Sequence, residues 1–125
     1  MKRILLAEDD KFLRRAAEAK LRQRGFDVLT AVDGEEAVAL AIKRPPDLML
    51  LDLLMPKCDG LQVLHALRAN EATRQIPVVI LSNSSKELEM QRASSLGAVA
   101  YWVKANLSLQ ELCDRVDQLF AEAVR

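Results

Sequence analysis

The chain has 125 residues, of which 50% are hydrophobic and 29% are charged, with four glycines and four prolines. This length suits one ordinary domain, and the composition excludes a disordered or low-complexity chain. Eighteen basic residues balance 18 acidic ones, so the sequence lacks the global positive charge that is typical of nucleic-acid-binding domains.

Short apolar runs alternate with helical patterns along the chain. An apolar run that stops at a polar residue indicates a strand buried on both faces, and apolar residues three and four positions apart indicate an amphipathic helix. In chain order we predict a strand at 4–7, a helix that ends near Arg24, a strand at 28–31, a helix that starts at Asp33 and ends before Pro45, a strand at 48–51, a helix around 61–67, a strand at 78–81, a helix that starts at Ser84 and stops before Gly97, a strand at 98–103, and a helix from Ser108 to Arg125.

Capping residues mark several of these helix ends. A Ser or Asp followed three residues later by Glu is typical of a capping box. The pairs with this spacing are Asp33 with Glu36, Ser84 with Glu87, and Ser108 with Glu111. Gly25 and Gly97 are stop signals after two of the helices. Asp10, at the start of the first helix, is better suited to capping than to chemistry.

The alternation of strands and helices predicts the fold class. Parallel strands need a crossover connection, and right-handed crossovers place helices on both faces of the sheet. Five strands alternating with five helices therefore predict an α/β fold with a doubly wound, five-stranded parallel sheet.

Polar side chains follow four of the predicted strands. Glu8 and Asp9 follow the first strand and Asp52 the third, while Ser82 and Lys104 follow the fourth and fifth. A single acid at a strand end is usually just solvated, but ligands of such sheets bind beyond the carboxyl ends of the strands, so this convergence favours a site. Clustered carboxylates repel one another unless a cation such as Mg²⁺ neutralises them. With a lysine nearby, one carboxylate could accept a phosphoryl group.

The motifs that carry these groups resemble the receiver domain of bacterial two-component response regulators, over essentially the whole chain. They are LLAEDD at 5–10, LLDLLMP at 50–56 with Asp59-Gly60, VILS at 79–82, and GAVAYWVK at 97–104. The resemblance implies a single receiver domain at residues 1–125. It also implies a flavodoxin-like (βα)5 topology with strand order 2-1-3-4-5.

The resemblance also implies roles for the acidic residues. Asp52 would be the phosphorylated residue, and the cofactor would be Mg²⁺. Asp9 would bind the ion directly and Glu8 largely through water, with Asp52 and the backbone carbonyl of Leu54 as further ligands.

The remaining site residues would convert phosphorylation into a change of surface. Lys104 would pair with the phosphoryl oxygens, and Ser82 would donate its hydroxyl to the phosphoryl group. Tyr101 would then swing inward and alter the surface of the fourth helix, fifth strand and fifth helix. Trp102 should face the opposite side of the sheet from Tyr101, because side chains alternate along a strand.

The implied function is phosphorelay signal transduction. The donor would be a histidine kinase, a phosphotransfer protein or a small acyl phosphate, and the output would be contact with a downstream protein. We expect no enzymatic turnover of another substrate, no direct nucleic-acid binding and no membrane insertion. Cys58 and Cys113 have no disulfide-framework or zinc spacing, and the apolar runs are too short to span a bilayer, so we expect a cytoplasmic location.

The same residues allow three alternatives to this interpretation. A carboxylate-nucleophile phosphatase would resemble the pattern DxDx(T/V), but position 54 is Leu. A flavin-binding domain would need a phosphate loop where the acidic pair stands. A receiver-like interaction module that does not respond to phosphorylation stays open, because an intact set of residues does not prove a working switch.

Three further features of the sequence lead to separate expectations. Family members commonly have proline after the site lysine, but this chain has Ala105, which predicts a trans peptide bond. Apolar Leu54, two residues beyond Asp52, suggests slow hydrolysis of the phosphoryl group. The outer side of the first helix is basic, which could attract an acidic partner or steer a kinase domain, but a merely solvated face is the preferred interpretation. The residues concerned are Lys11, Arg14, Arg15, Lys20, Arg22 and Arg24.

Overall fold

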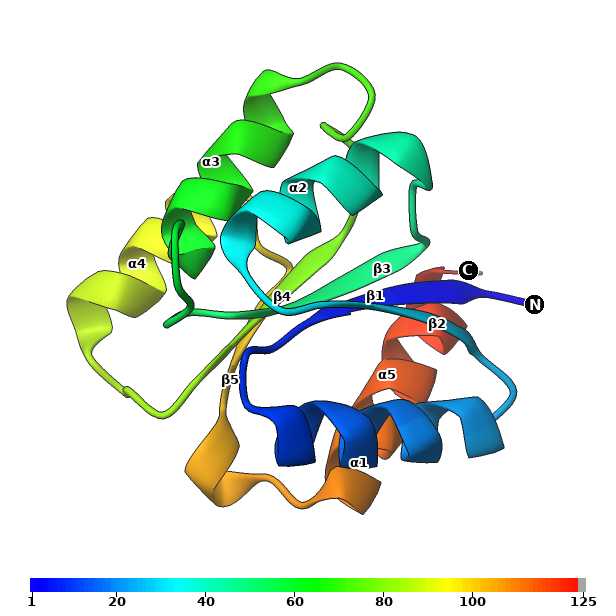
Figure 1. Ribbon diagram of the computed structural model, residues 1–125. Coiled ribbons are helices and arrows are strands. Elements are labelled where there is room, and N and C mark those ends of the chain that lie inside the picture. The colour runs from blue at the N-terminus through cyan, green and yellow to red at the C-terminus, as the bar shows by residue number, and fades with distance from the viewer. Residues whose placement is uncertain (124–125) are drawn as a thin grey trace.

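The computed structural model describes residues 1–123, in which five strands and five α-helices alternate (Figure 1). In chain order the elements are β1 (Arg3–Ala7), α1 (Lys11–Gln23), β2 (Asp27–Ala31), α2 (Gly34–Lys43), β3 (Leu48–Asp52), α3 (Gly60–Ala69), β4 (Val78–Ser82), α4 (Glu87–Ser95), β5 (Ala100–Val103), the short 3-10 helix η1 (Lys104–Asn106) and α5 (Leu109–Ala123).

The strands form one parallel sheet in the order β2-β1-β3-β4-β5. Helices α2, α3 and α4 cover one face of this sheet, and α1 and α5 cover the other (Figure 1). This arrangement confirms the predicted doubly wound, flavodoxin-like topology. The connections run in opposite directions from β1 and from β3, and this switch point is where such sheets bind their ligands.

Alternating side chains divide the core into two apolar layers. One layer lies between the sheet and α2, α3 and α4, and includes Leu51 and Ile80. The other lies between the sheet and α1 and α5, and includes Leu50 and Leu81. Because the central strands are buried on both faces, they are almost wholly apolar until they reach the polar residues at their carboxyl ends.

Several predicted helix ends are confirmed. Asp10 accepts hydrogen bonds from two amides in the first turn of α1, and Asp33 accepts one from the amide of Glu36. Ser108 and Glu111 exchange both bonds of a capping box. After α1 and α4, the chain turns at Gly25 and Gly97, whose φ angles of 93° and 84° favour glycine.

The predicted capping box of Ser84 with Glu87 is wrong. Helix α4 begins at Glu87, and its N-terminal cap position is held by Lys86 without a side-chain hydrogen bond. The Ser84 hydroxyl instead accepts a hydrogen bond from the amide of Lys86, 3.2 Å away. Serine forms such local turns readily, and this turn delays the start of the helix.

The predicted strand at 98–103 starts two residues too early, because β5 begins at Ala100. The amide of Gly97 donates to the carbonyl of Ser94, and the amide of Ala98 donates to that of Ala93. These two bonds close the end of α4, so Ala98 belongs to the helix terminus.

Three other expectations concern the chain as a whole. Helix α5 is described to Ala123, so the last two residues of the predicted helix, 124 and 125, lie outside the described residues. Within residues 1–123 no peptide bond is cis, so the Lys104–Ala105 bond is trans, as predicted. No helix in this described part is long and apolar enough to cross a membrane.

Candidate functional site

The polar residues predicted to converge do lie at one edge of the sheet. Glu8 directly follows β1, and Asp52 is the last residue of β3. Ser82 ends β4, and Lys104 begins η1 directly after β5. The strands are parallel and in register, with Asp52 beside Leu81, so their carboxyl ends meet at the same place.

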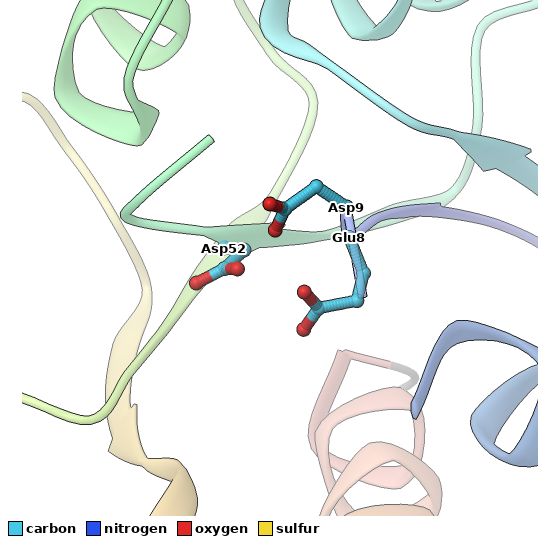
Figure 2. Close-up of side chains that lie close together, drawn as sticks. All are labelled: Glu8, Asp9 and Asp52. Atoms are coloured by element: carbon cyan, nitrogen blue, oxygen red, sulfur yellow. The ribbon is translucent and has the colours of Figure 1, made fainter. Parts of the chain in front are cut away.

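Three carboxylates face a common space at this edge. Glu8, Asp9 and Asp52 point toward one another (Figure 2), and each offers an oxygen within 4.8 Å of the others. Glu8 is 1% exposed and Asp52 is 4% exposed, whereas Asp9 lies at the surface. An oxygen-only set with one side open to solvent fits Mg²⁺, which keeps several waters and takes few carboxylates.

Lys104 joins two of these carboxylates. Its Nζ donates to Oε1 of Glu8 at 2.8 Å and lies 3.1 Å from Oδ2 of Asp52. The lysine side chain is only 17% exposed, so these ion pairs lie largely out of water. A single ammonium group cannot neutralise three carboxylates, which leaves the cluster with an excess of negative charge.

Proton affinities in the cluster reflect this crowding. Burial raises the pKa of Asp52 to about 7, and the hydrogen bond and negative charge of Glu8 act in the same direction. Burial also favours a higher pKa for Glu8, but hydrogen bonds with Asp52 and Lys104 outweigh it and leave that pKa lowered. Without a divalent cation, Asp52 therefore takes up a proton at a higher pH than an ordinary carboxyl group, and a bound cation would displace that proton.

Ser82 and Tyr101 meet at the backbone of Ser84. The amide of Ser84 donates to the buried hydroxyl oxygen of Ser82 at 2.9 Å. Its carbonyl accepts a hydrogen bond from the Tyr101 hydroxyl, also at 2.9 Å. The sequence did not mark Ser84 as a link, because both contacts use backbone groups that every residue but proline has.

Tyr101 and Trp102 face opposite sides of the sheet, as predicted. Tyr101 packs against the core layer beneath α2, α3 and α4, while Trp102 is buried in the layer beneath α1 and α5. Leu54, two residues beyond Asp52, exposes 73% of its surface. The metal-ligand role assigned to its carbonyl remains a prediction.

Gly60 explains how the loop after Asp52 folds back onto it. The Gly60 amide donates to the carbonyl of Leu53 at 2.7 Å. A Cβ atom at position 60 would lie 2.7 Å from the backbone oxygen of Asp52, closer than such atoms can approach. A residue without a side chain is therefore required where α3 begins.

The assignment of the six basic residues of the first helix to a solvated outer side is wrong for Arg14. Arg24, the C-terminal cap of α1, stays exposed and forms surface ion pairs with Asp114 and Asp117 of α5. Arg14 is half-buried and donates to backbone carbonyls of the acidic turn. A signal was present for Arg14, because it lies three and seven residues before Ala17 and Leu21, the buried positions of α1.

Comparisons with known proteins agree with this geometry. Residues 4–117 match the family described as the response regulator receiver domain. The chain is 36% identical over its whole length to the DNA-binding dual master transcriptional regulator RpaA of Synechocystis sp., of which it covers 52%. The chain spans about half the length of this and of several other curated relatives.

Solved structures give the same match in three dimensions. The receiver domain of Francisella response regulator 1452 superposes with a TM-score of 0.88 and 30% sequence identity, over 98% of this chain and 99% of that one. The Mn²⁺-bound form of response regulator Rcp1 has a TM-score of 0.81 and 30% identity, over 95% of this chain and 91% of that one.

Proposed function

The chain belongs to the response regulator receiver domain family, and from this premise we propose that it accepts a phosphoryl group on Asp52 and signals through a change of its surface. The observation that carries the proposal is the cluster itself. Asp52 lies 3.1 Å from the Lys104 ammonium group and shares its space with the carboxylates of Glu8 and Asp9.

In the proposed reaction a carboxylate oxygen of Asp52 attacks phosphorus. The new bond joins this oxygen to phosphorus, and the bond from phosphorus to the histidine nitrogen or acyl oxygen of the donor breaks. A bound Mg²⁺ supplies positive charge that offsets both the carboxylates and the phosphoryl oxygens. Glu8, Asp9, Asp52 and the carbonyl of Leu54 are the proposed ligands.

Lys104 orients and stabilises the transferred group in this proposal. Its ammonium group already lies beside Asp52, and Glu8 holds it there with a 2.8 Å hydrogen bond. Burial lowers the pKa of Lys104, but its bonds and ion pairs with Glu8 and Asp52 outweigh that effect and leave the pKa raised. The amine therefore stays charged and can pair with phosphoryl oxygens as they arrive.

The switch proposed for Ser82 and Tyr101 runs through Ser84. A phosphoryl group adds about 1.5 to 2 negative charges and three acceptor oxygens, which can recruit the Ser82 hydroxyl as a donor. Moving Ser82 disturbs its bond with the Ser84 amide, and the Ser84 carbonyl is bound to Tyr101. The segment that leads into α4 would then shift together with Tyr101, changing the surface of α4, β5 and α5.

The proposed partners follow from this chemistry. Receiver domains interact with histidine kinases or phosphotransfer proteins, and we propose one of these, or a small acyl phosphate, as the donor. The output is contact with another protein. DNA binding is printed for RpaA, but this chain covers only half of that protein, and we assign none to it. The proposed location is the cytoplasm, which suits the free thiols of Cys58 and Cys113.

One observation favours a second candidate, an interaction module that does not respond to phosphorylation. The Tyr101 hydroxyl donates to the Ser84 carbonyl at 2.9 Å, a contact that holds the tyrosine in one position. If this contact never breaks, the surface of α4 and β5 is fixed.

Beryllofluoride, an analogue of the phosphoryl group, separates the two candidates. Amide NMR spectra would be recorded with Mg²⁺, with and without beryllofluoride, on the wild type and on Asp52→Asn. The proposal predicts wild-type shifts at residues 82–86 and at Tyr101 that the variant does not show. Shifts confined to the immediate surroundings of Asp52 would favour the fixed module, and identical responses of both proteins would reject Asp52 as the acceptor.

A further inference from the structure

Arg14 reaches from the start of α1 back to the turn that carries two of the three carboxylates. Its Nη1 donates to the carbonyl of Glu8 at 2.9 Å and to the carbonyl of Asp9 at 3.3 Å. The arginine is half-buried, and hydrogen bonds from a charged donor are stronger than those between neutral groups. These contacts fix two consecutive peptide units of the turn.

The turn needs such support because it presents adjacent side chains to the same space. Successive side chains of a strand point to opposite faces, yet Glu8 and Asp9 both face Asp52 (Figure 2). The chain must therefore leave the strand geometry at Asp9 and be held in its new course. An unsupported turn could rotate one of the two carboxylates away.

Two other hydrogen bonds reach this turn, but neither can replace the contacts of Arg14. The amide of Glu8 donates to the carbonyl of Ala31 at 3.0 Å, which anchors only the end of the strand. The amide of Asp10 donates to Oε2 of Glu8 at 3.2 Å, and this bond uses an oxygen of a proposed metal ligand. Arg14 holds the turn through carbonyls alone and itself occupies no carboxylate oxygen.

We propose that Arg14 is a positioning residue for the divalent cation, because it fixes the backbone at Glu8 and Asp9 so that both carboxylates face Asp52. The inference rests on the proposed function for the role of the cation. The bracing of the turn by Arg14 stands on the two hydrogen bonds alone.

If Arg14 acted only through its positive charge, removing it would change the affinity for Mg²⁺ in the opposite direction. A guanidinium group near a cation site repels the cation, so its removal would tighten Mg²⁺ binding. Loss of a positioning contact weakens metal binding, and outer-shell partners of metal ligands typically contribute about 10- to 100-fold. The direction of the change therefore distinguishes positioning from simple repulsion.

The test compares the wild type with Arg14→Met, Arg14→Lys and the control Arg15→Met. Methionine keeps most of the apolar stem of arginine and removes the hydrogen-bond donors. Lysine keeps the positive charge, but its side chain is shorter and lacks the planar guanidinium group. Arg15 is the exposed neighbour on the same helix, so its substitution removes the same charge without touching the turn. Urea unfolding and circular dichroism establish that each variant is folded.

Two measurements are made on each protein. Calorimetric titration with Mg²⁺ should show about tenfold weaker binding for Arg14→Met, a clear loss for Arg14→Lys, and near-wild-type binding for Arg15→Met. Amide hydrogen exchange in EDTA should be faster at Asp9 and Asp10 in both Arg14 variants, without a matching change within α1.

The possible results separate the positioning role from the proposed function. Mg²⁺ binding by Arg14→Met that equals or exceeds the wild type overturns the inference, as does unchanged exchange in the turn. If Arg14→Met does not fold, Arg14→Lys decides in the same way. If the wild type itself does not bind Mg²⁺, the proposed function fails and the cation role of Arg14 fails with it, while the exchange data still report whether Arg14 braces the turn.

Discussion

Replacing Asp52 with Asn should stabilise the metal-free protein at neutral and alkaline pH. Asp52 is buried beside Glu8, and burial raises its pKa from 3.8 to about 7. The folded state therefore binds more protons at this position than the unfolded state between these values. By linkage, the free energy of unfolding of the wild type falls as the pH rises from about 4 to about 7. Asparagine has no charge to bury and removes this dependence.

The size of the effect follows from the same pKa. The interval from 3.8 to about 7 corresponds to about 4 kcal/mol, at about 1.4 kcal/mol for each tenfold change in proton affinity. This value is an upper bound, because the substitution also removes the hydrogen bond that helps to lower the pKa of Glu8. We expect Asp52→Asn to exceed the wild type by about 2 to 4 kcal/mol near pH 8 and by little near pH 4.

The assay is urea unfolding in EDTA at several pH values, followed by fluorescence of Trp102, which is 8% exposed in the folded protein. Asp47→Asn is the control, because Asp47 lies at the surface away from the cluster and should keep the wild-type pH slope. Saturating Mg²⁺ should stabilise the wild type, by about 2.7 kcal/mol at 100 times its Kd, and leave Asp52→Asn unchanged. A stability gap that does not vary with pH, or a variant less stable than the wild type near pH 8, would refute the reasoning.

Substitutions at three further positions test other parts of the structure. Gly60→Ala places a Cβ atom 2.7 Å from the carbonyl oxygen of Asp52 and should cost about 1 to 3 kcal/mol in urea unfolding, whereas an unchanged midpoint would mean that the loop relaxes freely. Arg68 donates to four backbone carbonyls and thereby joins the ends of α3 and α4 to the segment before β4. Arg68→Met should lower the free energy of unfolding by about 2 to 4 kcal/mol and speed amide exchange around Gly97. A variant as stable as the wild type would contradict this bracing. Asp10→Ala removes the cap of α1 and should cost about 1 kcal/mol, while Asp10→Asn should cost little; equal losses would argue for a role of the charge itself.

Much of the fold could be predicted from the sequence because its signals are local. Apolar runs that stop at polar residues gave the strands, and the stop signals Gly25 and Gly97 gave the ends of two helices. The wrong predictions concern the start of β5 and the cap of α4, where neighbouring residues compete for the same backbone groups. Ala98 is apolar enough for a strand, yet its amide is needed to close α4, and Ser84 satisfies a local turn before it can cap a helix.

The site, too, was predictable where it depends on residue type and strand ends, and not where it depends on backbone groups. The strand-end rule brought together Glu8, Asp52 and Lys104, because parallel strands must end at a common edge. The contacts of Arg14 and Ser84 were missed because they involve backbone carbonyls and amides, which residue type does not reveal. Periodicity places Arg14 on the buried face of α1, whereas its charge favours exposure, and the charge is the weaker guide here.

Phosphotransfer from acetyl phosphate, read by intact mass, tests the central claim most directly. The wild type, Asp52→Asn and the control Asp59→Asn would each be incubated with the donor in Mg²⁺ and in EDTA. The account predicts that the wild type and the control gain the mass of one phosphoryl group in Mg²⁺ only, and that Asp52→Asn gains none. Labelling of Asp52→Asn equal to that of the wild type, or labelling that is the same in EDTA, would contradict it.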